Sequence, residues 1–172
     1  FFSSGAEPPR HVEALAAGAA ALARSGAHAA VVFAVRGGRL DRVLAGVAGV
    51  EVVTFPGRAE LDRVTAHHFP RFDVVVSPPH ERSNWAAALG LPFLLVGPDI
   101  GPFAPRNRRW LLDHGVAAEI IDADHARRLP GQLDELRGSG RLLAMSERGE
   151  RPCPGFDEAA RFAIREVERR SG

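Results

Sequence analysis

Short apolar runs alternate with amphipathic segments along this chain. The apolar runs, which predict strands, lie at residues 1–2, 30–35, 50–55, 72–76, 92–97 and 116–122. Between them, apolar residues recur at helical spacing, which predicts helices over 10–24, 37–47, 59–68, 82–90 and 107–114. Strands and helices that alternate in this order are typical of a parallel sheet.

The predicted strands are almost uniformly apolar, so we expect them to be buried on both faces and covered by helices on both sides. Two or three further helices are expected after residue 122, the last of them over 154–170. With 172 residues, 45% of them hydrophobic, the chain has enough material for one core. The sequence therefore predicts one α/β domain over residues 1–172, with a parallel sheet of about six strands.

The amino-acid composition limits the kinds of molecule that the protein is expected to bind. The 22 basic and 21 acidic residues give a net charge of +1, so no overall field would attract nucleic acid or an anionic membrane. No apolar run approaches the ~20 residues of a membrane span. The single cysteine, Cys153, leaves no internal disulfide to form and fits a reducing, cytoplasmic location.

The loops that follow parallel strands meet at one edge of the sheet, where ligands of such folds bind. Three of these loops contain unusual polar residues. The first, Ser3-Ser4-Gly5, lies between a strand and a helix, where backbone N–H groups can bind an anion. It lacks the spacing of a dinucleotide motif and has no Walker lysine, so a plain turn is the alternative.

The second loop follows the run at 72–76 and contains Ser77, His80, Ser83 and Asn84. Ser83 or Asn84 can cap the helix that follows, and the two prolines of the loop would hold His80 at the edge of the sheet. The alternatives are a ligand-binding loop and a solvated loop with a capping residue.

The third loop, residues 97–107, is long and rich in proline and glycine for a simple connection. Its Asp99 and Asn107 are candidates for hydrogen bonds to sugar hydroxyls. A metal site is disfavoured because the histidines do not form a set with ligand spacing. A Ser-His-Asp hydrolase is disfavoured because no GxSxG motif follows a strand.

Several of these segments together resemble a known family. DVVVS at 73–77, a helix that ends in AALGLP at 87–92, Asn107 and a helix that ends in DHG at 113–115 resemble the carboxyl-terminal domain of GT-B glycosyltransferases, most closely the family-28 group. SSG falls at the family's first loop, and EAARFAIREV at 158–167 resembles its closing helix.

The resemblance implies a Rossmann-like domain that binds a nucleotide-sugar donor without metal or other cofactor. It also implies that the chain is the carboxyl-terminal half of a longer protein, whose amino-terminal half binds the acceptor and can associate with a membrane. The donor-binding residues would be Ser3, Ser4, Gly5, Ser77, His80, Ser83, Asn84, Asp99 and Asn107. The catalytic base would lie in the other half.

The sequence also departs from the family at three places, the first being Pro78-Pro79-His80 where the family has a glycine-rich turn. Trp85 stands where the family has a ribose-binding glutamate, and Phe103 and Ala104 stand where it has a sugar-contacting glutamine pair. Two other functions therefore remain open: a GT-B relative that binds a nucleotide or glycan without turnover, and a nucleotide-sugar epimerase or hydrolase of the same superfamily.

Overall fold

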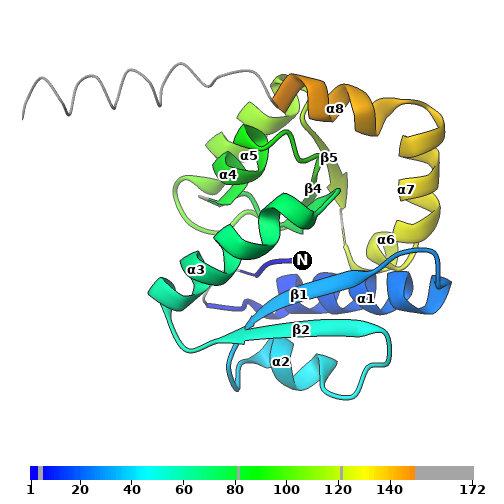
Figure 1. Ribbon diagram of the computed structural model, residues 1–172. Helices are drawn as coiled ribbons and strands as arrows, with labels where there is room; N and C mark the ends of the chain where they lie inside the picture. Colours follow the sequence, from blue (N-terminus) through cyan, green and yellow to red (C-terminus); the bar gives the residue numbers. More distant parts are fainter. Residues whose placement is uncertain (4–5, 81, 121, 150–172) are drawn as a thin grey trace, which may run out of the picture.

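A computed structural model describes residues 1–3, 6–80, 82–120 and 122–149 (Figure 1). Its helices and strands alternate as the hydrophobic pattern predicts. In chain order they are α1 (Pro9–Ser25), β1 (Ala30–Val35), α2 (Arg39–Leu44), β2 (Val50–Phe55), α3 (Arg58–His68), a 3-10 turn (Phe69–Arg71), β3 (Val75–Ser77), α4 (Arg82–Ala88), β4 (Phe93–Val96), α5 (Ala104–Asp113), β5 (Ala117–Ile120), α6 (Ala123–Arg127), α7 (Leu129–Gly138) and α8 (Arg141–Gly149). The closing helix predicted over 154–170 lies outside the described residues.

All the strand pairs are parallel, which confirms the predicted α/β class. β1 pairs with β2 from Ala30↔Val50 to Val35↔Phe55, and β4 lies between β3 and β5. The strands nevertheless form one sheet of two and one of three, rather than the predicted single sheet of about six. The prediction fails at residues 1–2, because this short run makes only an isolated bridge, Phe2↔Phe33.

The Phe1–Phe2 segment lies between the two sheets and hydrogen-bonds to both. On one side, the amino group of Phe1 donates to Val31 O at 2.8 Å and the Phe33 amide donates to Phe1 O at 2.9 Å. On the other side, the Phe2 amide donates to Val76 O at 2.9 Å. The two sheets are therefore linked through these two residues.

Side chains of this layer alternate between two hydrophobic cores, as the period of a strand requires. The first core lies beneath α1, α2, α6 and α7, and it contains Phe1, Val76 and Leu94. The second core lies beneath α3, α4 and α5, and it contains Phe33 and Phe2, the residue next to Phe1. Helices thus cover both faces, as predicted (Figure 1).

Burial differs among strands whose sequences look alike. β3 and β4 are buried at every position, whereas β2 is half-exposed along most of its length. Among the described residues, β2 pairs on one side only, with β1, so no described strand covers its other edge. Full burial on both faces is therefore confirmed for β3 and β4 and is wrong for β2.

Candidate functional site

The candidate site lies at the edge where the parallel strands end. α1 follows the Phe1–Phe2 segment and packs on the first core. α4 follows the neighbouring strand β3 and packs on the second core, on the opposite face of the sheets. When helices after adjacent parallel strands diverge in this way, a crevice forms between their first turns. Ser3 follows Phe2 and the second loop follows β3, so both lie at the edge where such a crevice would form.

His80 makes a hydrogen bond at each of its two ring nitrogens within the second loop. The Arg82 amide lies 3.1 Å from His80 Nδ1, and Ser77 Oγ lies 2.8 Å from His80 Nε2. A backbone N–H can only donate, so Nδ1 is the acceptor and a neutral ring carries its proton on Nε2. The Ser77 hydroxyl, which donates to Pro78 O at 3.0 Å, then accepts from His80. In this arrangement His80 cannot serve as a base toward Ser77.

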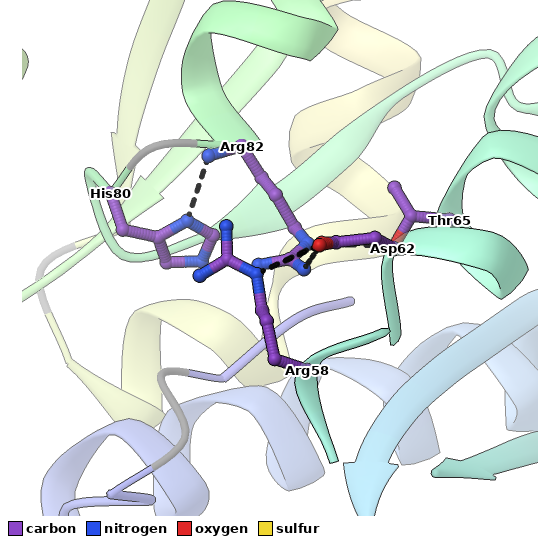
Figure 2. Close-up of polar contacts among 5 residues, drawn as sticks. All are labelled: Arg58, Asp62, Thr65, His80 and Arg82. Carbon is purple, nitrogen blue, oxygen red and sulfur yellow. Dashed lines mark hydrogen bonds and ion pairs between the residues drawn. The ribbon is translucent and has the colours of Figure 1, made fainter. Parts of the chain in front are cut away.

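A buried arginine fixes the position of this loop against α3 (Figure 2). Arg82, only 4% exposed, donates from Nη2 to Asp62 Oδ1 at 2.7 Å and from Nε to Thr65 Oγ1 at 3.4 Å. Arg58 contacts the same carboxylate from the solvent side, at 3.0 Å. The sequence analysis did not identify Arg82 or Asp62, because their contact joins residues 20 positions apart in the chain.

Two predicted site residues have hydroxyls that the fold leaves without a partner. Ser3 Oγ and Ser83 Oγ are both shielded from solvent, and neither has a hydrogen-bond partner among the described residues. Ser3 follows Phe2 and Ser83 lies in the first turn of α4, so they come from two segments that diverge at this edge of the fold. A buried hydroxyl without a partner is unfavourable, and a bound molecule is one way in which the missing hydrogen bond can be supplied.

Asp99 and Asn107 are both held by contacts within the chain. Asp99 Oδ1 accepts from Arg108 Nε at 2.6 Å, and Arg108 also contacts Glu119 at 2.6 Å. Asn107 Nδ2 lies 3.5 Å from Pro79 O, at the outer limit for a hydrogen bond, and this contact joins α5 to the second loop. The structure therefore brings the second and third loops together, with Asp99 already paired to a cation.

His11 is a further polar residue at this edge. It is 1% exposed, and its Nε2 lies 2.6 Å from Pro98 O, which joins α1 to the third loop. Burial lowers the pKa of the His11 imidazole below its ordinary value of 6.5. Its Nδ1 is buried and has no partner among the described residues. Sequence reasoning missed this position, although its place beside Val12 on the apolar face of α1 was a signal of burial.

The remaining candidates divide into two groups. Ser4, Gly5 and the side chain of Asn84 lie outside the described part of the structure. Trp85 packs partly buried beside the second core, and its ring meets that of Phe69 edge to face, with centroids 6.4 Å apart. Trp85 thus contacts a core residue at the position where the resemblance implies a ribose-binding glutamate.

Within the described ranges, the structure holds no group of three metal-ligating side chains and no helix long and apolar enough to cross a membrane. Comparison with known proteins adds no assignment: no family model, curated protein or solved structure matches the chain. What the chain's own fold defines is an α/β protein with parallel strands alternating with helices.

Proposed function

We propose that this chain is the donor-binding domain of a GT-B-type glycosyltransferase, and that it binds a nucleotide-sugar in the crevice beside β3. The observation that carries the proposal is the pair of unpartnered hydroxyls, Ser3 Oγ and Ser83 Oγ, on the two segments that diverge there. Hydroxyl donors on both sides of such a crevice suit a diphosphate, whose oxygens accept hydrogen bonds.

The connectivity supports the same proposal. Counting Phe1–Phe2 as the central strand gives the spatial order β2, β1, Phe1–Phe2, β3, β4, β5. This is the Rossmann-like order, in which nucleotides bind at the point where the order of the strands along the sheet reverses. The six-strand, Rossmann-like arrangement is part of the proposal, with Phe1–Phe2 as its shortest strand.

The contacts that Asp99 and His80 make at this edge favour binding over chemistry by these two side chains. Asp99 is bound to Arg108, and His80 presents its protonated nitrogen to Ser77. Neither is arranged to take a proton from an acceptor hydroxyl. A transferase built on this domain would therefore take its base from the acceptor half, and the chain alone would turn over no donor.

The experiment is a calorimetric titration of the chain with UDP-glucose, UDP and free glucose. We expect UDP-glucose and UDP to bind weakly, since half of a two-domain cleft supplies only part of the contacts, and glucose to give no heat. The Ser3→Ala, Ser83→Ala double variant should lose most of the nucleotide affinity. Binding of neither nucleotide, in a chain whose melting curve is cooperative, would overturn the proposal.

A further inference from the structure

Glu7 is a buried acidic residue between the first loop and α1. It is only 4% exposed. Its backbone has a φ of 43°, in the left-handed region that residues with a side chain rarely adopt. A buried carboxylate and a left-handed backbone each cost stability, so both persist only where the surrounding contacts hold them in place.

The carboxylate of Glu7 ties this part of the chain to the end of β1. Glu7 Oε1 accepts from the Val35 amide at 3.2 Å, and Oε2 accepts from the Leu40 amide at 3.1 Å. Val35 is the last residue of β1, and Leu40 lies in the first turn of α2. Each bond uses one oxygen, so both donors are satisfied only by a full carboxylate. A glutamine would offer one oxygen and one N–H group.

The turn between β1 and α2 leaves room for this carboxylate at Gly38. A Cβ at that position would lie 2.5 Å from Glu7 Oε2, closer than such atoms approach in folded proteins. The Gly38 amide donates to Val35 O at 2.7 Å, which closes the turn. The sequence therefore fits the turn closely around the Glu7 side chain.

The chain is thus anchored on both sides of the first loop. Before the loop, the Phe2 amide donates to Val76 O of β3, and after it Glu7 is bound to the end of β1. Ser3, whose buried hydroxyl has no partner among the described residues, lies between these two anchors. A hydroxyl that is held in place before a ligand arrives loses less conformational freedom on binding.

We propose that Glu7 is a positioning residue of the candidate site: its carboxylate, bound at the end of β1, holds the chain so that the Ser3 hydroxyl is placed for the phosphate oxygens of the ligand. This inference rests on the proposed function. Glu7 acts through Ser3 and touches no ligand. Ser83 lies on α4, which Arg82 fixes against α3, so its contribution should not depend on Glu7.

The test is a double-mutant cycle measured by calorimetric titration with UDP. Glu7→Gln keeps the shape of the side chain but turns an N–H group toward a backbone donor. Glu13→Gln, at an exposed position on α1, is the matched control. Ser3→Ala and Ser83→Ala are each introduced into the parent chain and into both glutamine variants.

We expect Ser3→Ala to lower UDP affinity about fivefold in the parent and in Glu13→Gln, and by about twofold or less in Glu7→Gln. Ser83→Ala should lower it about fivefold in all three proteins. An equal effect of Ser3→Ala in the parent and in Glu7→Gln would overturn the inference. So would a loss of both serine contributions in Glu7→Gln, because a general loss of structure weakens the two together.

Glu7→Gly is the second variant, for use if Glu7→Gln does not fold. It removes the carboxylate but suits the left-handed backbone, so it relieves strain at that position. The cycle with the two serines is then repeated in this background, with the same expected and contradicting results.

A comparison of NMR spectra without ligand separates this inference from the proposed function. Glu7→Gln should shift the amide signal of Ser3, and Glu13→Gln should leave it in place. A parent chain that binds no UDP would overturn the proposed function, and the Ser3 signal would still report whether Glu7 holds this segment. An unmoved Ser3 signal in Glu7→Gln would overturn the positioning role even in a chain that binds UDP.

Discussion

The amide of Phe2 donates a hydrogen bond to Val76 O at 2.9 Å, and this contact joins the two sheets of the protein. It also places Ser3, the next residue, beside the end of β3. The candidate site depends on this contact, because Ser3 and Ser83 can bind one ligand together only if the two sheets remain side by side.

Removal of the unpartnered hydroxyls should separate binding from stability. Ser83→Ala deletes a polar atom that the fold buries without a partner, so we expect the free energy of unfolding to stay level or rise by up to about 1 kcal/mol. Nucleotide affinity should fall by about fivefold, which corresponds to one lost hydrogen bond. Thermal melts and titration with UDP measure the two effects. A loss of stability without a loss of affinity would show that the hydroxyl serves the fold.

The loop after β3 should depend on the Arg82–Asp62 pair. Asp62→Ala leaves the guanidinium of Arg82 buried without its carboxylate, and we expect a loss of about 2 kcal/mol in unfolding free energy. Asp62 is itself 37% exposed, which keeps the loss below that of a fully buried pair. Urea denaturation measures it.

Glu60→Ala, on the same helix, is the matched control for Asp62→Ala, because the Glu60–Arg63 pair is exposed and should cost little. Equal effects of the two variants would contradict a structural role for Arg82.

Trp85 should tolerate apolar replacement better than a charge. Trp85→Phe keeps an aromatic ring against Phe69, whereas Trp85→Glu puts a charged carboxylate beside the second core. We expect a much lower Tm for the glutamate variant and a small change for the phenylalanine variant. A glutamate variant that melts normally and binds UDP more tightly would show instead that the side chain faces the crevice.

Acid should destabilise the protein partly through His11. Its pKa is lowered in the folded state, so the unfolded chain binds the proton more readily. The stability that this group contributes is complete above pH 6.5 and is lost as the pH falls toward the lowered folded value. His11→Gln, which does not titrate, should lose less stability than the parent between pH 7 and pH 5. Parallel pH curves for the two proteins would contradict this assignment.

The hydrophobic pattern located most of the elements but not every boundary. The strands over 30–35 and 50–55 agree residue by residue with β1 and β2, because turns bound both runs. The strand predicted over 72–76 begins too early in the sequence. β3 begins at Val75, because Phe72 caps the preceding 3-10 turn and its ring packs against other rings. Helix α5 begins at Ala104, before the predicted Asn107, because proline is tolerated in a first helical turn.

The candidate site was predictable only in outline. Strand ends locate Ser77 and Asp99 at one edge, but the contacts that fix them, His80 with the Arg82 amide and Arg108 with Asp99, depend on three-dimensional placement. The buried state of Ser83 Oγ likewise depends on how α4 packs. The nucleotide-sugar specificity implied by the resemblance stays a prediction.

The central claim is that a nucleotide-sugar binds at the carboxyl edge, between the segments of Ser3 and Ser83. The most direct test is an amide NMR titration of the isotopically labelled chain with UDP-glucose. The account predicts shifts concentrated at Ser3, Ser77 and Ser83, with Val31 and the rest of the amino edge unaffected. Shifts at the amino edge alone, or none at any residue at millimolar ligand, would contradict it.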